Sequence, residues 1–309
     1  MRILVTGGAG FIGSHIVDAL IIKGNEVAVV DNLSTGKEEN INPEARFFHV
    51  DLTDFEALES VFVETKPEVV FHTAAQIDVR KSVEDPSFDA EINVVGSVNL
   101  FSLCVRYGVK RVIFSSTGGA LYGEPPTIPA DENTPIEPLS AYGVAKFAVE
   151  QYLNYFKRLY GLEAVILRYG NVYGPRQDPL GEAGVIAIFL GRILSNASPV
   201  IYGDGRQTRD YIYIEDIVKA NLLSIEGLED IYNIGTGIET LVNDLIRAFS
   251  KILNREIKPI YVSPRKGEVQ RIALDTSKAK SKLGFMAQFS LEEGIRSTIK
   301  WYITDGGRR

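Results

Sequence analysis

A glycine-rich stretch near the amino terminus constrains the fold more than any other part of this 309-residue sequence. The stretch TGGAGFIGSH follows the short apolar run Ile3–Thr6 and places Gly7, Gly10 and Gly13 three residues apart. Glycines at this spacing let a strand turn tightly into a helix, and they let the backbone approach a pyrophosphate at the helix amino terminus. The sequence therefore predicts a dinucleotide-binding βαβ unit.

The first half of the chain continues this alternation of strands and helices. Apolar, β-branched runs predict six strands, at Ile3–Thr6, Val27–Asp31, Arg46–Asp51, Val69–Thr73, Arg111–Ser115 and Ala164–Arg168. Apolar residues at helical spacing predict helices at Phe11–Lys23, Phe55–Thr65, Pro86–Tyr107, Ala141–Tyr160, Leu241–Leu253 and Leu291–Ile303. We expect an α/β fold, with a Rossmann-like doubly wound parallel sheet over residues 1–169. A smaller, irregular α/β substrate-binding lobe is expected over residues 170–309, with an approximate boundary and segments that can interleave.

Composition argues against several functional classes. The net charge of −7, from 33 Lys and Arg against 40 Asp and Glu, gives no support to a nucleic-acid-binding surface. The amino terminus lacks the apolar region of a signal peptide, and no run of about 18 consecutive apolar residues is present. The single cysteine, Cys104, excludes an internal disulfide, and His15, His49 and His72 lack the spacing of metal ligands. We expect a soluble, cytoplasmic protein with no membrane partner and no metal.

The end of the second predicted strand specifies the dinucleotide. Asp31 lies 18 residues beyond Gly13, where a carboxylate accepts hydrogen bonds from the adenosine ribose. A 2′-phosphate at that position would be repelled by the carboxylate. The sequence therefore favours NAD over NADP.

A tyrosine and a lysine one helical turn apart form a second candidate site. In SAYGVAK, residues 140–146, Tyr142 and Lys146 share one face of a helix that Ser140 caps. A tyrosine with an ordinary pKa of about 10 needs that pKa lowered by roughly 3 to act as a base near neutral pH. Lys146 and a bound, positively charged nicotinamide are expected to supply this lowering.

Together, these residues resemble the extended short-chain dehydrogenases/reductases. The resemblance rests on the three-glycine spacing, on HTAA at residues 72–75, on Asn93 and on Tyr142 with Lys146. It implies that NAD is contacted by Gly7, Gly10, Phe11, Ile12, Gly13, Asp31, Asn32, Asp51, Leu52, Ala74, Ala75, Asn93, Ser115, Tyr142, Lys146 and Tyr169.

Four further motifs are most similar to those of the UDP-glucose (UDP-galactose) 4-epimerases, and the similarity runs over nearly the whole chain. They are FSSTGGALYGE (114–124), LRYGNVYGPRQ (167–177), YGDGRQTRDYIYIEDI (202–217) and RKGEV (265–269). The resemblance implies that Thr117 and Tyr142 bind the sugar 4-hydroxyl and that Lys146 assists Tyr142. It also implies that Asn171, Arg209 and Arg265 hold the UDP diphosphate. Glu268 matches the acidic residue that binds the uridine ribose in that family.

Alternatives on the same scaffold remain open. A nucleotide-sugar 4,6-dehydratase or decarboxylase resembles this chain but carries carboxylates after the Thr117 position, where Gly118 and Gly119 stand here. A non-catalytic NAD-binding module would be expected to have lost Tyr142 or Lys146, and both are present.

The sugar and the assembly also stay open at this level. An N-acetylated hexosamine or a uronic acid is an alternative substrate. Ile272 stands where related epimerases vary a gatekeeping side chain, which predicts some tolerance of a C2 acetamido group. The family commonly pairs two helices per subunit in a dimer interface. Pro86–Tyr107 and Ala141–Tyr160 match those helices, so a homodimer is expected.

Overall fold

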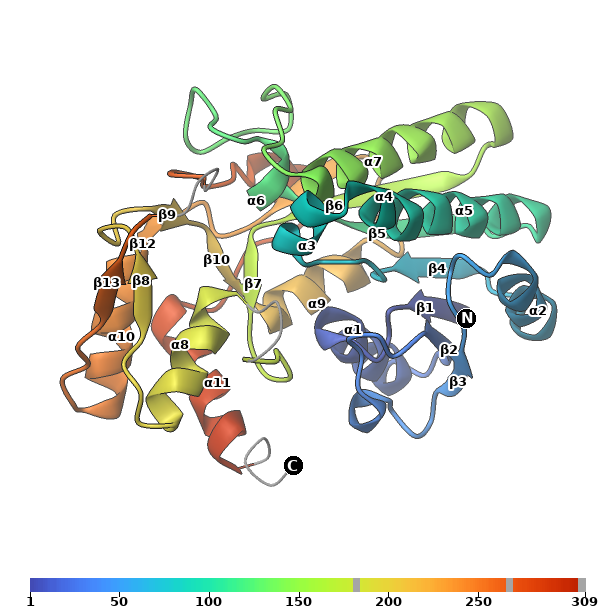
Figure 1. Ribbon diagram of the computed structural model, residues 1–309. Helices are drawn as coiled ribbons and strands as arrows, with labels where there is room; N and C mark the ends of the chain where they lie inside the picture. Colours follow the sequence, from blue (N-terminus) through green and yellow to red (C-terminus); the bar gives the residue numbers. More distant parts are fainter. Residues whose placement is uncertain (180–183, 265–268, 305–309) are drawn as a thin grey trace.

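A seven-stranded parallel sheet forms the core of the larger part of the molecule, on the right in Figure 1. The computed structural model describes residues 1–179, 184–264 and 269–304. In spatial order the strands are β11 (Ile231–Ile234), β6 (Glu163–Tyr169), β5 (Arg111–Thr117), β4 (Val69–His72), β1 (Arg2–Thr6), β2 (Glu26–Asp31) and β3 (Arg46–His49). The chain order therefore reverses between β1 and β4, which makes a doubly wound sheet with its switch point at that pair.

Successive residues of each central strand pack against opposite faces of the sheet. In β1, Ile3 and Val5 belong to one apolar cluster, whereas Leu4 belongs to the other. Strands buried on both faces need continuous apolar runs, which explains why Val and Ile dominate these segments.

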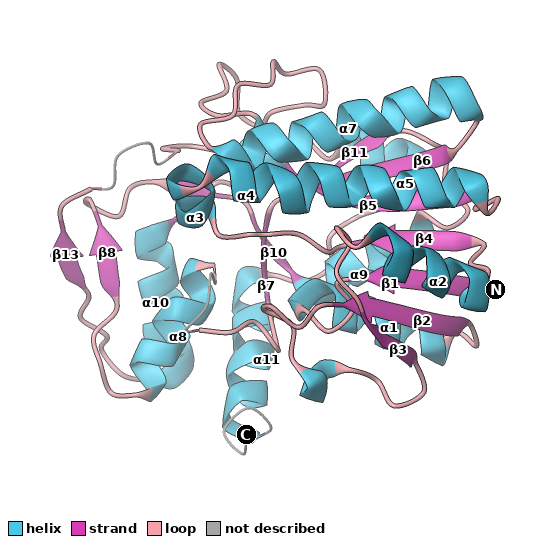
Figure 2. Ribbon diagram, turned by 45° about the vertical axis from the view of Figure 1, so that its right-hand side comes forward, coloured by secondary structure: helices cyan, strands magenta, loops and turns pink. Residues whose placement is uncertain are grey.

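Helices cover both faces of the sheet (Figure 2). On one face lie α1 (Phe11–Ile22) and α9 (Ile214–Leu223), which contact each other. The other face carries α2 (Phe55–Thr65), α5 (Gly96–Arg106) and α7 (Ala141–Tyr160). The six predicted strands are confirmed, with ends that shift by one or two residues, and β11 is a seventh that the sequence pattern did not predict.

The predicted helix Pro86–Tyr107 differs from expectation, because a wider turn interrupts it. It consists of α4 (Pro86–Ala90), the π-helical turn η2 (Glu91–Val95) and α5. Asn93 lies in the π turn, and its side chain bonds the backbone N and O of Gln76 in the loop after β4. Such turns hold one extra residue and are frequent at functional sites.

The second half of the chain builds a lobe of short strand pairs and helices. Its strand pairs are β7 (Asn171–Tyr173) with β10 (Tyr211–Tyr213), β8 (Val200–Tyr202) with β13 (Ile260–Val262), and β9 (Thr208–Arg209) with β12 (Thr240–Leu241). Its helices include α8 (Val185–Leu194), α10 (Val242–Leu253) and α11 (Leu291–Thr304). Because α9 and β11 return to the large sheet, the two halves of the chain interleave, and the division after residue 169 remains a prediction.

The shorter elements lie in connections. They are η1 (Glu38–Asn40), α3 (Val79–Glu84), α6 (Gly118–Leu121) and η3 (Ala279–Leu283). Of these, α3 contacts α7, and α6 directly follows β5, so both lie beside the carboxyl end of the sheet.

A buried ion pair fixes α7 to the two strands beneath it. The side chains of Glu150 and Arg168 are 0% and 4% exposed, and Arg168 Nη2 lies 2.7 Å from Glu150 Oε2. Ser116 Oγ donates to Glu150 Oε1 at 2.6 Å, and Arg168 Nη1 donates to the Tyr122 hydroxyl at 2.9 Å. Every polar group of this cluster therefore has a partner, which is the condition under which a buried ion pair is tolerated.

We expect Glu150→Ala to lower the free energy of unfolding by about 3–5 kcal/mol, because it leaves the Arg168 guanidinium buried without its counter-charge. The matched control is Glu256→Ala, which removes a glutamate whose partner Lys258 lies 3.4 Å away in a pair that is 79% and 76% exposed. Urea denaturation should show no measurable change for the control. Equal destabilisation by the two substitutions would contradict the role given to the buried pair.

Candidate active site

Most residues of the candidate site lie at or beyond the carboxyl ends of β1, β4, β5 and β6. Open α/β sheets bind ligands in the crevice outside these strand ends, at the point where strand order reverses. Four connections meet there: the glycine turn after β1, the loop after β4, the β5–α6 junction and the first turn of α7. The fold thus brings both sequence-predicted motifs to one edge of the sheet.

The glycine turn is too crowded for side chains. Gly7 has a φ of +71°, and a Cβ there would lie 2.6 Å from the Ala74 backbone N. A Cβ on Gly13 would lie 2.2 Å from Gly7 O. Because Gly10 provides no side-chain cap for α1, the first amide groups of the helix keep their N–H donors. Helix N–H groups beside a bare glycine backbone fit the pyrophosphate of a dinucleotide.

Asp31 lies at the end of β2 with its carboxylate held by backbone. Its Oδ2 accepts from Ala9 N at 3.0 Å and its Oδ1 from Leu33 N at 2.8 Å. Burial raises the pKa of this carboxyl, while the two backbone N–H groups oppose that rise. A carboxylate has about four acceptor sites, so the two contacts leave capacity for a ribose diol.

The next predicted cofactor residues lie beside Asp31. Asn32 Nδ2 donates to Asp51 Oδ2 at 2.6 Å, and Asp51 Oδ1 accepts from the backbone and hydroxyl of Thr53. These hydrogen bonds, with the Asn32 contact among them, lower the Asp51 pKa against the opposing effect of burial. Leu52 is buried, and the position of a Cβ on Gly96 would lie 3.0 Å from its Cβ. The side chains of Asn32, Asp51 and Thr53 therefore hold one another in place beside Asp31.

The side chain of Asn93 is engaged within the protein. Its Oδ1 accepts from Gln76 N at 2.8 Å, and its Nδ2 donates to Gln76 O and to Asp89 Oδ1, both at 3.0 Å. Gln76 Nε2 also donates to Asp89 Oδ1 at 2.8 Å. Asn93 thus ties down the loop that follows Ala74 and Ala75. Gln76 and Asp89 were not predicted, because one is a polar residue in a loop and the other a polar residue on a helix, and neither has a distinct sequence signal.

Tyr142 and Lys146 share one face of α7, as predicted. Ser140 caps the helix by accepting from Gly143 N at 3.2 Å, which places Tyr142 in the first turn. The Lys146 side chain is buried, its Nζ donates to Ser115 O at 3.0 Å, and it lies 5.8 Å from the centre of the Tyr142 ring. Burial lowers the Lys146 pKa to about 8, against the opposing effects of Asp89 and Glu150.

The Tyr142 pKa does not behave as the sequence predicts for the protein alone. Burial and the negative charge of Asp89 raise it above the ordinary value. The groups of the polypeptide therefore do not by themselves make Tyr142 a base. Any lowering has to come from positive charge brought close to the hydroxyl, which is a role that a nicotinamide cation can fill.

The strand ends beneath Tyr142 carry three hydroxyl groups. Thr117 Oγ1 accepts from Ala120 N at 3.2 Å and so caps the short helix α6. Ser115 Oγ lies 3.1 Å from the Tyr169 hydroxyl, which also accepts from Asn221 Nδ2 at 2.7 Å. Burial raises the Tyr169 pKa to about 12, so this phenol stays protonated. Thr117 keeps a hydroxyl hydrogen to donate.

Of the residues predicted to hold the UDP portion, the structure describes Asn171 and Arg209. Asn171 Oδ1 is buried and has no hydrogen-bond partner in the described part of the chain, and the position of a Cβ on Gly119 lies 3.3 Å away. Arg209 Nη1 donates to Thr208 O at 2.8 Å. The neighbouring buried Asp210 accepts from Asn171 N through its carbonyl at 2.6 Å and so ties the two together. Arg265 and Glu268 lie outside the described residues.

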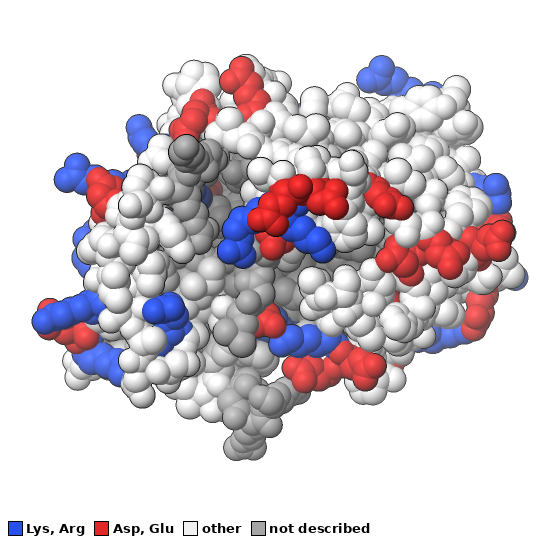
Figure 3. Space-filling model, viewed as in Figure 1, with Lys and Arg blue, Asp and Glu red and all other residues white. Residues whose placement is uncertain are grey.

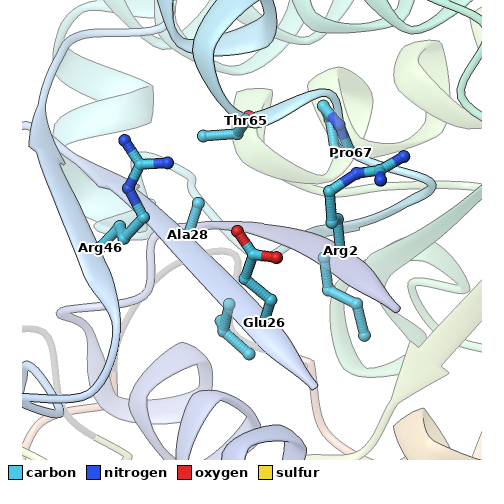
Figure 4. A pocket seen from close by; sticks show the side chains of 8 residues that line it. Arg2, Glu26, Ala28, Arg46, Thr65 and Pro67 are labelled. Atoms are coloured by element: carbon cyan, nitrogen blue, oxygen red, sulfur yellow. The ribbon is translucent and has the colours of Figure 1, made fainter.

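A small pocket at the opposite edge of the sheet does not compete with this site. Arg2, Glu26 and Arg46 line it at the amino ends of the strands (Figure 4), and its volume is about 10 Å³. That space holds one water at most. Over the described ranges, no group of three or more His, Cys, Asp or Glu side chains is arranged to hold a metal ion.

Comparison with known proteins gives full-length matches. The NAD dependent epimerase/dehydratase family matches residues 3–235. The chain is 50% identical to the UDP-glucose 4-epimerase of Thermotoga maritima, solved with UDP-glucose, with a TM-score of 0.96 over 98% of this chain and 99% of that one.

Two further solved structures are similar. The UDP-glucose 4-epimerase of Thermus thermophilus, in complex with NAD, is 45% identical, with a TM-score of 0.95 over 99% of this chain and 100% of that one. The UDP-N-acetylglucosamine 4-epimerase of Methanobrevibacter ruminantium, in complex with UDP-N-acetylmuramic acid, is 41% identical, with a TM-score of 0.92 over 98% of both chains.

We expect Asp31→Asn to weaken NAD binding by about 10- to 100-fold, because it removes charged hydrogen bonds to the ribose worth about 1.5–3 kcal/mol. Binding of NADP should weaken less, because the substitution also removes a repulsive charge. Calorimetric titrations with both dinucleotides measure this, and Asp54→Asn, which retains the cap of α2, is the matched control. Equal affinity of the unaltered protein for NAD and NADP would contradict the role of Asp31.

Proposed function

Because the chain belongs to the NAD dependent epimerase/dehydratase family, we propose that it interconverts UDP-galactose and UDP-glucose by inverting the sugar at C4. The observation that carries this proposal is the convergence of Tyr142, Lys146 and Thr117 at the strand ends beside the glycine turn. NAD, when bound, supplies a reversible oxidant for C4. The sugar then passes through a 4-keto form, and the reaction has no net redox change.

Each of the three residues has a distinct role in this proposal. The Tyr142 phenolate would accept the proton of the sugar 4-hydroxyl, and the resulting phenol would later return it. Lys146 places a fixed positive charge beside that phenol, anchored by the Ser115 carbonyl. Thr117 donates a hydrogen bond to the sugar oxygen. Together these groups stabilise charge on O4 while its proton is absent.

The UDP portion is assigned to the second lobe. The buried, unpartnered Oδ1 of Asn171 supports a polar ligand contact there, because buried acceptors otherwise find donors. Arg209 follows Thr208 on β9, within the same lobe, and arginine is suited to bidentate diphosphate contacts. Arg265 and Glu268 complete the proposed set from the sequence resemblance alone.

The β5–α6 junction disfavours the dehydratase alternative. A Cβ on Gly118 would lie 2.6 Å from Leu274 Cδ2, so a carboxylate there requires the Leu274 side chain to move. Neither Gly118 nor Gly119 can move a proton at C5 or C6. The chemistry proposed is therefore limited to C4.

Exposed apolar side chains on α7 and η2, on the side that faces away from the sheet, support a homodimer. Val144, Tyr152, Tyr155 and Leu159 of α7 are 42–58% exposed, and Val95 of η2 is 50% exposed. The adjoining helical run Pro86–Arg106 is long and apolar enough to cross a membrane by length and composition alone, a test that core helices of soluble proteins also pass. We assign these faces to a second copy of the chain.

Charge and cysteine chemistry support the remaining assignments. Basic and acidic side chains are interspersed on the face seen in Figure 3, and the net charge is −7, so no nucleic-acid partner is proposed. The one thiol, Cys104, is buried, and burial raises its pKa. A protein without disulfides suits the reducing cytoplasm, which is the proposed location.

We expect Tyr142→Phe to lower kcat for UDP-galactose by at least about 100-fold, the lower limit for a positioned general base, while NAD binding persists. Tyr160→Phe is the matched control, because it removes a hydroxyl from the exposed carboxyl end of the same helix. The measurement is UDP-glucose formation by NMR. Near-normal turnover of Tyr142→Phe would contradict the base assignment, and it would favour a non-catalytic tyrosine.

A second candidate substrate carries a C2 acetamido group, and the 41% identical UDP-N-acetylglucosamine 4-epimerase favours testing it. Ile272 is 1% exposed and packs in a cluster with Tyr122, Ala130 and Leu274. Because Ile272 is buried, a larger side chain there would perturb the packing of this cluster, which lowers the free energy of unfolding by about 1–3 kcal/mol. It would also narrow the space for the sugar if Ile272 lines the sugar site.

In competition, we expect UDP-galactose to be favoured and UDP-N-acetylgalactosamine to be converted detectably. Hydrophobic walls discriminate such sizes by about 1–3 kcal/mol, or roughly 10- to 200-fold. Ile272→Tyr should lower kcat/KM for the acetylated sugar more than for UDP-galactose. Overpacking slows the conversion of both sugars alike, so the test of Ile272 as a gatekeeping residue is the ratio of the two kcat/KM values. An unchanged ratio would contradict that role.

A further inference from the structure

Asp89 is a buried carboxylate beside the proposed catalytic pair. It is 0% exposed, and it lies on α4, which packs against α7 (Figure 1). Its Oδ1 accepts from Gln76 Nε2 at 2.8 Å and from Asn93 Nδ2 at 3.0 Å. Its Oδ2 is buried and has no hydrogen-bond partner within residues 1–179, 184–264 and 269–304. One oxygen is thus fixed, and the other is shielded from solvent.

The amide groups that hold Asp89 are themselves fixed. Gln76 Nε2 also donates to Asp78 O, and Gln76 Oε1 accepts from Asp78 N. Asn93 is bound to the Gln76 backbone on both sides. The carboxylate therefore has a defined position that does not depend on a flexible side chain.

The ionisable groups around Lys146 and Tyr142 are few. Glu150, on the next turn of α7, is neutralised by Arg168. His72 of β4 is buried between Thr6 and Ser97, and burial and Lys146 lower its pKa to about 3, so it is neutral. Tyr169 of β6 stays protonated.

The other charged groups of α3, α4 and η2 are exposed. They are Arg80, Lys81, Glu84, Asp85 and Glu91. Asp78, which caps α3, is partly buried and lies 3.7 Å from Arg80 Nε. Burial raises the Asp89 pKa, and the hydrogen bonds from Gln76 and Asn93 and the charge of Lys146 oppose that rise.

We propose that Asp89 is a positioning residue of the reaction: its fixed, buried carboxylate on α4 sets the charge of Lys146 and Tyr142 on the neighbouring helix α7. This inference rests on the proposed function, because it concerns the same pair of residues. Asp89 thereby joins Tyr142 and Lys146 as a third ionisable group that acts on the reaction.

The electrostatic effect has a definite sign for each partner. A negative charge favours the protonated ammonium, so Asp89 raises the Lys146 pKa and keeps the cation charged despite burial. The same charge disfavours a phenolate, so Asp89 also raises the Tyr142 pKa. Removing the charge therefore moves both pKa values downward.

The test is the pH dependence of kcat/KM for UDP-galactose in Asp89→Asn. Asparagine keeps an oxygen for Gln76 and Asn93 but carries no charge. We expect the acid limb, set by Tyr142, and the alkaline limb, set by Lys146, both to move to lower pH by about 1 unit. Asp85→Asn is the matched control, because it removes a carboxylate from the exposed cap of α4 and keeps a capping side chain. Its two limbs should not move.

A second readout does not require turnover. Lysine labelled with ¹³C at Cε is titrated by NMR, and the Lys146 signal is assigned by its absence in Lys146→Arg. The Lys146 pKa, about 8 in the unaltered protein, should fall in Asp89→Asn and stay unchanged in Asp85→Asn. Asp89→Ser removes the same charge with a smaller side chain, and it takes the place of Asp89→Asn if that variant does not fold.

The outcomes separate this inference from the proposed function. An unaltered protein that does not convert UDP-galactose contradicts the proposed function, whereas the NMR titration still tests Asp89. The inference is overturned if the unaltered protein is active and Asp89→Asn is slower but keeps both limbs of its pH profile and its Lys146 pKa unchanged. Asp89 would then have only a structural role.

Discussion

The burial of the Lys146 ammonium at the carboxyl end of β5 is the interaction on which the site depends. An unpaired cation in a protein interior is costly, and burial lowers the Lys146 pKa to about 8 although Asp89 and Glu150 oppose that lowering. The Ser115 carbonyl accepts its hydrogen bond, and carboxylates on α4 and α7 favour its charge. This arrangement requires α7 to hold one register against β5. The Glu150–Arg168 pair, bonded to Ser116, supplies that register from one helical turn away.

The dinucleotide cradle and the catalytic helix are linked through the loop after β4. The backbone of Ala74 packs so closely against Gly7 that no side chain fits there. Two residues later, the backbone of Gln76 is hydrogen-bonded to the side chain of Asn93 in the π turn. Asn93 in turn holds Asp89, which faces α7. A chain of contacts therefore connects the phosphate turn to α4, which packs against α7.

Much of this arrangement could be predicted from the sequence, because it follows from local patterns. The glycine spacing, the alternation of apolar strands with helices, and Tyr142 with Lys146 one turn apart are each encoded within a short stretch. The strand β11 and the π turn at Asn93 could not be predicted, because tertiary pairing with β6 and with Gln76 produces them. For the same reason Asp89 looked like one more polar residue on a helix. The raised pKa of Tyr142 was missed because burial cannot be obtained from residue spacing.

The proposed reaction inverts C4 of a UDP-hexose by removing and restoring one hydrogen at that carbon. The direct measurement is incubation of the purified protein and NAD with UDP-galactose deuterated at C4, with products followed by NMR and mass spectrometry. We expect UDP-glucose that retains deuterium at C4, without accumulation of reduced nucleotide. Absence of UDP-glucose, or product that has exchanged its C4 deuterium for solvent hydrogen, would contradict it.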